Sequence, residues 1–199
     1  RTRMVSFSTQ GARLRHIVRQ TGRELGKRVE LNLDGAEVEI DRNVLERMIG
    51  PFEHMIRNSI DHGIENETAR RKKGKAPIGR ITIASSQEGS EVIIRFSDDG
   101  EGLNIKAIRT KAIERGLMSA DANLSEEELI QFILVSGFST ADKITHVSGR
   151  GVGMDVVHSE VKQLGGSMSV DTEEGVGTTF IIRLPLTLSI MQALMVYVG

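Results

Sequence analysis

The sequence of 199 residues contains no cysteine and no tryptophan, a single tyrosine and only 4% aromatic residues. Without cysteine, the chain has neither disulfides nor thiolate metal ligands. So few aromatic rings leave little on which nucleic-acid bases could stack. The formal net charge is −1, so no overall basic field would draw the chain to nucleic acid or to a membrane surface.

Long apolar runs are also absent. No stretch approaches the roughly 18 to 20 apolar residues of a membrane-spanning helix, and no secretory signal is visible. We therefore expect a cytoplasmic protein with no direct membrane insertion. Hydrophobic residues make up 39% of the sequence, which is enough for one domain with a sizeable core. The first residues, RTRMVSF, do not resemble a natural start and indicate a piece of a longer chain.

Hydrophobic periodicity predicts a mixture of helices and strands. Helical spacing is present over 10–27, 42–63, 105–115, 125–135 and 154–164. Strand-like alternation occurs in VELNLDG and AEVEID, which we expect to form a hairpin, and in RITIASSQ, EVIIRFSDD, SMSVDT and TTFIIRLP. This order predicts an α+β fold, a two-layer sandwich with helices packed on one face of a largely antiparallel sheet.

Two basic segments have more than one interpretation. The helix predicted over 10–27 carries several arginines and could meet an acidic partner, although a solvated face is the commoner explanation. The segment RRKKGK, residues 70–75, could suggest nucleic acid. Because it has no interleaved aromatic residues, we interpret it as a solvated loop and expect no nucleic-acid partner.

The helix predicted over 42–63 has the most informative pattern. His54, Asn58 and His62 are spaced by four and share a face with Asp61, beside a broad apolar stripe. Such a polar line indicates either an exposed surface or the wall of a wet site. Zinc is one candidate ligand, but the two histidines are more than two turns apart and no HExxH pattern is present. The carbonyl oxygen of an asparagine suits a hard cation such as magnesium better.

Three glycine-rich segments follow this helix. SDDGEGLN places Asp98 at a strand end, where a carboxylate can accept a hydrogen bond from an exocyclic amine and glycines admit close approach. SGRGVGMDVV, residues 148–157, opens a helix whose exposed N–H groups and dipole suit a phosphate. EGVGTTF by itself is a hairpin turn. Each signal is weak alone, and the sequence has neither a Walker loop nor a Rossmann arrangement.

The order of these segments resembles the GHKL (Bergerat) ATP-binding fold: HMIRNSIDHG on a helix, then DDGEG, then GRGVG opening a helix, then GVGTTF. RNSIDHGIE, GFSTADKITHVSGRGVGMDVV and GTTFIIRLPLTLSIMQALMVYVG are similar to the CheA-type chemotaxis histidine kinases. The resemblance covers nearly the whole chain and implies a mixed, largely antiparallel sheet. It implies an ATP-binding kinase catalytic domain over 28–186, a helix over 1–27 leading from a dimerisation segment, and the start of a CheW-like regulatory domain over 187–199.

The resemblance also implies roles for individual residues. Asn58 would hold Mg²⁺ through its side-chain oxygen, and His54, the second catalytic residue, would contact the γ-phosphate or the metal, or assist proton movement from the accepting histidine. Asp98 would accept a hydrogen bond from the adenine amino group of ATP. A lid over 137–150 would close on the nucleotide, and Lys106 would either reach a phosphate or lie on a helix surface. The other residues implied to contact or shape the ATP site are Arg57, Asp61, His62, Gly100, Gly102, Ser148, Gly149, Arg150, Gly151, Val152, Gly153, Met154 and Thr178.

The reaction follows from the residue at the position of the catalytic base. ATPases of this fold, such as gyrase and the heat-shock chaperones, place a glutamate four residues before the asparagine, where this sequence has His54. Glu53 is one residue away, about 100° around the helix. Loss of the carboxylate disfavours attack by water, whereas transfer to an imidazole needs mainly positioning and charge neutralisation. We therefore expect a protein histidine kinase, with a GHKL ATPase and a degenerate nucleotide-binding scaffold as the alternatives.

The histidine that accepts the phosphoryl group is expected elsewhere. His16, His146 and His158 lack the setting of a phosphoacceptor, so the acceptor should lie on a separate histidine phosphotransfer domain. The other partners implied by the resemblance are the dimerisation domain, a CheW-like coupling protein with its receptor array, and a downstream response regulator. The cofactors implied are ATP and Mg²⁺.

Overall fold

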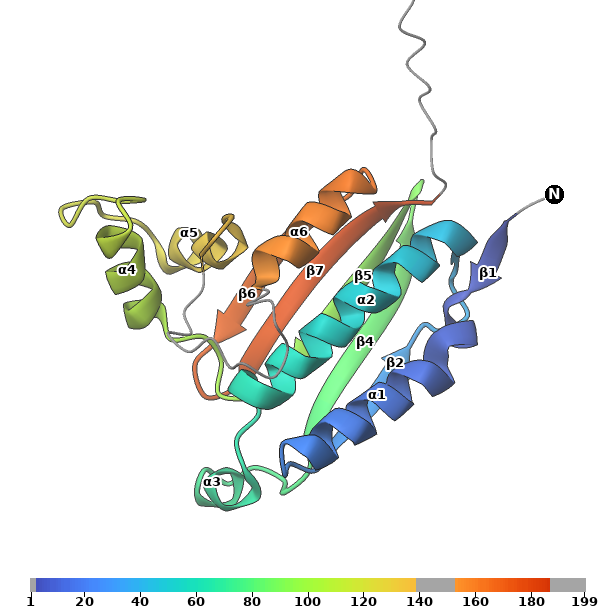
Figure 1. The fold of residues 1–199 in the computed structure, drawn as a ribbon, viewed down its shortest axis with the longest axis horizontal. Coiled ribbons are helices and arrows are strands. Elements are labelled where there is room, and N and C mark those ends of the chain that lie inside the picture. Colours follow the sequence, from blue (N-terminus) through green and yellow to red (C-terminus); the bar gives the residue numbers. More distant parts are fainter. Residues whose placement is uncertain (1–2, 139–152, 187–199) are drawn as a thin grey trace, which may run out of the picture.

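A computed structural model of the protein describes residues 3–138 and 153–186. Its central sheet has five strands in the order β2 (Val29–Asp34), β4 (Gly79–Glu88), β5 (Glu91–Asp98), β7 (Gly177–Pro185) and β6 (Ser167–Glu173). One face of this sheet is covered by the helices α1 (Gly11–Glu24), α2 (Arg42–Asn58) and α6 (Met154–Gln163), as Figure 1 shows. The predicted α+β sandwich with helices on one face is confirmed.

Strand pairing is mixed, as expected, but one predicted pairing is wrong. β2 is parallel to β4, whereas the other three pairs of neighbours are antiparallel. The segments VELNLDG and AEVEID do not form a hairpin with each other. Instead, β3 (Glu39–Asp41) pairs with β1 (Met4–Ser6) in a separate two-stranded sheet. The physical reason is that the chain leaves the sheet after Gly35. The carbonyl oxygens of Ala36 and Val38 then accept hydrogen bonds from the backbone N–H groups of Ser8 and Phe7.

The core lies between α2 and the sheet. α2 begins after Asp41, whose carboxylate accepts hydrogen bonds from the backbone N–H groups of Asn43 and Val44, at 2.8 and 3.3 Å. Its buried stripe packs against the inner side of the strands and also meets α1 and the short helix η1 (Phe7–Gln10), with Phe7 edge-on to Phe52. Removing these side chains from water is the main force that fixes α2 over the sheet.

The carboxyl end of α2 widens into a π-helical turn, η2 (Ser59–Gly63). The backbone N–H of Ile64 donates to Ser59 O, five residues earlier, at 2.7 Å. Single π-helical turns are rare and occur often at functional sites. This turn brings the segment SIDHG to the end of the sheet where β5 ends and β7 begins.

The remaining helices lie beside the β6 edge of the sheet and beyond the carboxyl end of α2 (Figure 1). They are α3 (Glu67–Lys72), α4 (Ile105–Glu114), α5 (Glu126–Ile130) and the short η3 (Gln131–Leu134). The helices predicted over 105–115 and 125–135 correspond to α4 and to α5 with η3. Within the ranges that the structure describes, no helix is long and apolar enough to cross a membrane.

The interpretation of residues 70–75 as a solvated loop is wrong. Part of the segment forms α3, and the side chain of Arg70 is 1% exposed. Its guanidinium forms ion pairs with Glu65 at 3.3 Å and with Asp99 at 2.9 Å. A basic side chain is buried only when such partners compensate for its lost hydration, and one of these partners comes from the distant end of β5.

Candidate functional site

Asp98 lies at the end of β5, where three segments of the chain converge. It is opposite Thr178 of β7 in the sheet register. The hydroxyl of Ser59 donates a hydrogen bond to Asp98 Oδ2 at 3.0 Å, and the backbone N–H of Gly100 donates to Oδ1 at 2.9 Å. One carboxylate is thus fixed by the π-helical turn and by the loop that follows its own strand.

Burial raises the pKa of Asp98 above its ordinary value, while hydrogen bonds from Gly100, Ser59 and the backbone of Thr178 act in the opposite direction. A carboxyl group with a perturbed pKa and fixed geometry marks a candidate functional site. Each carboxylate oxygen has a further lone pair, so Asp98 can accept a hydrogen bond from a ligand amine while it keeps both bonds to the protein.

The glycines around Asp98 are required by close approach of the chain to itself. A Cβ added to Gly100 would lie 2.2 Å from the carbonyl oxygen of Gly63. A Cβ on Gly177, whose φ is +149°, would lie 2.0 Å from the carbonyl oxygen of Asp98. A Cβ on Gly102, whose φ is +77°, would lie 2.6 Å from the carbonyl oxygen of Glu173. Glycine therefore lets three backbone segments meet beside one carboxylate.

The polar line on α2 meets the amino end of α6. Asn58 Nδ2 lies 3.3 Å from His54 Nε2 and 3.5 Å from the sulfur of Met154, the first residue of α6. Gly153, which precedes α6, offers no side chain to cap its first N–H groups. The positive end of the α6 dipole therefore lies close to Asn58, which is an arrangement suited to an anion such as phosphate.

One side-chain oxygen near the amino end of α6, that of Asn58, is of a type that suits a hard cation. In the described part of the chain, both contacts recorded for the Asn58 side chain use its nitrogen, which leaves the carbonyl oxygen available. Such an oxygen is a ligand type that magnesium prefers. Residues 3–138 and 153–186 contain no group of three or more histidines and carboxylates arranged to hold a metal on their own.

Three predicted site residues lie farther along or around the helix. Arg57 forms an ion pair with Glu24 of α1 at 2.9 Å. His62 lies 3.4 Å from its neighbour Asp61, and its side chain is 61% exposed. The four-residue spacing brings His54 and Asn58 into contact, whereas His62 lies in the π-helical turn beside Asp61.

Several predicted site residues lie outside the described residues. They are Ser148, Gly149, Arg150, Gly151 and Val152, together with most of the predicted lid over 137–150. Lys106 is exposed on α4. Gly153, Met154 and Thr178 are described, and they lie at the amino end of α6 and at the start of β7.

Sequence reasoning missed Ser59, although the motif contains it. Its side chain is on the buried side of the helix, with 5% of the residue exposed. A hydroxyl among apolar neighbours must find a hydrogen-bond partner, and that requirement was the available signal. The partner itself, Asp98, is 39 residues away in the sequence.

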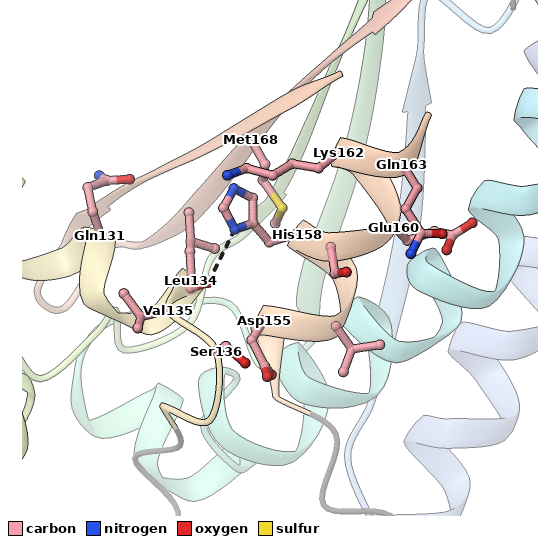
Figure 2. A pocket seen from close by; sticks show the side chains of 12 residues that line it. Gln131, Leu134, Val135, Ser136, Asp155, His158, Glu160, Lys162, Gln163 and Met168 are labelled. Atoms are coloured by element: carbon pink, nitrogen blue, oxygen red, sulfur yellow. Dashed lines mark hydrogen bonds between the residues drawn. The ribbon is translucent and has the colours of Figure 1, made fainter. Parts of the chain in front are cut away.

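A hollow of about 990 Å³ lies between η3 and α6 (Figure 2). Its lining includes Leu134, Val135, His158 and Met168, and one nitrogen of the His158 ring is 3.2 Å from the carbonyl oxygen of Leu134. Asp155, in the first turn of α6, is also among its lining residues, so the hollow borders the amino end of the helix that carries Met154.

Comparison with known families identifies the class of this protein. Residues 49–188 match the family of histidine kinase-, DNA gyrase B- and HSP90-like ATPases, and the chain belongs to this family. Membership implies that the ligand is ATP. The nucleotide-free catalytic domain of the histidine kinase ThkA has the same fold, with a TM-score of 0.54 at 15% identity over 92% of this chain and 95% of that one. The predicted GHKL fold is confirmed.

More specific similarity comes from curated relatives. Chemotaxis protein CheA of Treponema pallidum (strain Nichols) is 44% identical over 197 residues, which is 99% of this chain and 24% of that protein. CheA of Bacillus subtilis (strain 168) is 45% identical over 196 residues, 98% of this chain and 29% of that protein. The chain is thus a CheA-type domain of the GHKL class, as the sequence motifs predicted, and it spans about a quarter of the length of these relatives.

Proposed function

We propose that the chain is the ATP-binding catalytic domain of a CheA-like histidine kinase. In this proposal, the adenine amino group donates a hydrogen bond to Asp98, and the γ-phosphate is transferred to a histidine on a separate phosphotransfer domain. The observation that carries the proposal is the Asp98 carboxylate, held between Ser59 and Gly100 with acceptor capacity left for a ligand. Gly100, Gly102 and Thr178 shape the site on either side of it.

The phosphate end of ATP would lie between Asn58 and the amino end of α6. Asn58 would hold magnesium through its carbonyl oxygen, and bound magnesium supplies neutralisation of the phosphate charge. His54, which lies beside the Asn58 amide, would contact the γ-phosphate or the metal. Arg57, Asp61, His62 and residues 148–154 complete the proposed nucleotide contacts.

Transfer to histidine is favoured over hydrolysis by the residue four positions before Asn58. That residue is His54, which lies beside the Asn58 amide, whereas the neighbouring Glu53 is exposed. The site therefore lacks a carboxylate at the position from which ATPases of this fold activate water. An acceptor imidazole brings its own nucleophile, so the domain needs only to position it and neutralise charge.

The relatives suggest the wider setting. These relatives are named chemotaxis proteins, so we propose a role in chemotaxis or motility signalling in the cytoplasm. Residues 28–186 would be the catalytic domain, residues 1–27 would lead from a dimerisation domain, and residues 187–199 would begin a CheW-like regulatory domain. The proposed partners are the phosphotransfer domain, a CheW-like coupling protein with its receptor array, and a downstream response regulator.

The first test is calorimetric titration of the 199-residue chain with ATP, with and without magnesium. We expect binding by the unaltered chain, loss of binding in Asp98→Asn, and loss of the magnesium dependence in Asn58→Ala, which removes the oxygen ligand. Asp171→Asn, the same exchange at an exposed position of β6, should bind as the unaltered chain does. Absence of binding by the unaltered chain would leave a degenerate scaffold.

A second assay separates kinase from hydrolase. The chain is mixed with γ-labelled ATP and a histidine phosphotransfer domain supplied as a separate protein. We expect acid-labile label on the histidine of that domain and little release of inorganic phosphate. Rapid phosphate release without labelled protein would support the ATPase alternative instead.

A further inference from the structure

The basic segment after the π-helical turn is built into the loop that follows Asp98. Arg70 donates from Nη2 to Asp99 Oδ2 at 2.9 Å and from Nη1 to Asp99 O at 3.2 Å. The same guanidinium donates from Nε to Ala76 O at 2.6 Å and from Nη1 to Glu65 at 3.3 Å. Because only 1% of its side chain is exposed, Arg70 donates these hydrogen bonds to protein groups rather than to solvent.

Lys75 reaches the same loop from the other side of Glu65. Its ammonium donates to the carbonyl oxygens of Asp99 and Gly100, at 3.0 and 2.7 Å, and to Glu65 Oε2 at 2.8 Å. The Glu65 side chain is 3% exposed. Although burial opposes its ionisation, the hydrogen bond from Lys75 and the charges of Lys75 and Lys73 hold the pKa of Glu65 below its ordinary value. A charged Glu65 therefore braces both basic side chains.

These contacts converge on the peptide groups directly after Asp98. The carbonyl oxygens of Asp99 and Gly100 are bound by Arg70 and Lys75, and Asp99 Oδ1 accepts the backbone N–H of Arg80 at 2.8 Å. The N–H of Gly100 lies between these two carbonyls in the chain and donates to Asp98 Oδ1. The orientation of the Asp98 carboxylate therefore depends on groups that Arg70 and Lys75 hold in place.

We propose that Glu65, Arg70 and Lys75 are positioning residues that fix the Asp98 carboxylate for recognition of the adenine amino group. This inference rests on the proposed function, because it assigns the base-selecting geometry of that same site. None of the three side chains needs to touch the nucleotide. They act through the backbone of Asp99 and Gly100.

The arrangement is more specific than stability requires. A buried ion pair is often no more stabilising than apolar side chains of similar volume, because the charges lose their hydration. It does, however, fix geometry, and the planar fork of arginine makes several bonds that a lysine cannot reproduce together. The adjacent Arg71 offers a contrast, because its side chain is 64% exposed and pairs with Glu67 one turn away.

A cycle of protein and ligand changes tests the proposal. Arg70→Lys and the matched control Arg71→Lys are titrated with magnesium-ATP and with purine riboside triphosphate, which lacks only the 6-amino group. The unaltered chain should bind ATP about tenfold more tightly than the analogue, since a hydrogen bond to a charged group is lost. In Arg70→Lys this preference should fall at least about threefold, because the Asp98 carboxylate is no longer held in a fixed orientation. Arg71→Lys should keep the full preference.

Each other outcome overturns a stated part of the argument. If Arg70→Lys weakens both ligands equally, the cluster is not a positioning device and this inference fails alone. If the unaltered chain binds neither ligand, the proposed function fails and the inference falls with it. If Arg70→Lys does not give a cooperative thermal transition, Lys75→Gln is used in its place. Lys75 is 17% exposed and makes two of the loop contacts, so its loss should reduce the preference in the same direction.

Discussion

Asp98 shows how a binding group can oppose stability. Burial raises its pKa above the ordinary value of 3.8, so an ionised Asp98 at neutral pH is less favourable in the folded chain than in the unfolded chain. The contribution of this group to stability is present below pH 3.8 and is lost as the pH rises through the raised pKa of the folded state. Its hydrogen bonds to Ser59 and Gly100 only partly offset the burial.

We therefore predict that Asp98→Asn increases the free energy of unfolding at pH 7 while it abolishes ATP binding. Asparagine removes the buried charge but places an amino group where an acceptor is needed. In urea unfolding measured from pH 3 to 8, the free energy of unfolding of the variant should increasingly exceed that of the unaltered chain as the pH rises. Below about pH 4 the two should not differ in this way. Asp171→Asn is the control, and a variant less stable than the unaltered chain at pH 7 would contradict the prediction.

The sequence could predict the residues of the site better than their partners. The spacing of His54 and Asn58 is a local property of one helix, and the structure bears out their contact. Ser59 and Arg70 were missed or misread because their partners, Asp98 and Asp99, are supplied by a distant strand. A run of basic residues has the same composition whether it is solvated or buried, so only the fold separates the two.

At the scale of elements, the site depends on how closely the π-helical turn η2 and the loop after β5 approach each other. The atoms that set this distance are backbone atoms, since an added Cβ on Gly100 would lie 2.2 Å from Gly63 O. Backbone cannot move aside as the end of a flexible side chain can. The approach therefore tolerates no side chain at Gly100.

We predict that Gly100→Ala lowers the free energy of unfolding by about 1–3 kcal/mol, as overpacking does in other cores, and weakens ATP binding. Gly50→Ala is the matched control. Gly50 lies inside α2, and apart from its chain neighbours, one of which is Pro51, a Cβ there would have nothing within 4 Å. Alanine at position 50 should change stability by less than about 1 kcal/mol, because its helix preference is opposed by the contact of its Cβ with the ring of Pro51, and it should leave ATP binding unchanged. Equal effects of the two exchanges in urea unfolding would show that the close approach is not limiting.

The helices and strands themselves were largely predictable. Two strand pairings, β2 with β4 and β1 with β3, were not. Helices over 42–63 and 105–115 and the two hairpins of β4 with β5 and β6 with β7 follow from local periodicity and short turns. Alternation identifies β2 as a strand. Its parallel partner β4, however, begins at Gly79, 45 residues after β2 ends at Asp34. Period-two patterns carry no information about such distant pairing.

At the scale of the whole molecule, a two-layer fold has one well-covered face of the sheet and one outer face. Neighbouring residues of β7 sample the two faces. Ile182 is 0% exposed and belongs to the core beneath the helices, while Ile181 is only partly buried. Because both residues are isoleucine, truncating each of them compares how tightly side chains are packed on the two faces of the sheet.

We predict that Ile182→Ala lowers the free energy of unfolding by about 2–5 kcal/mol, through lost transfer energy and a cavity. Ile181→Ala should lower it by less than half as much, because its methyl groups are already partly in water. Urea unfolding of both variants gives the comparison. Equal losses would mean that the outer face is packed as tightly as the inner one.

The strand order has a consequence for how the chain is made. β7 lies between β5 and β6, and in this sheet β6 is joined to the other strands only through it. During translation, β2, β4 and β5 leave the ribosome first, yet the inner edge of β5 stays unpaired until residues 177–185 follow. Exposed strand edges of this kind invite wrong partners. The domain must therefore complete its sheet late in its own synthesis, so the nucleotide site, which needs the start of β7, is among its last parts to form.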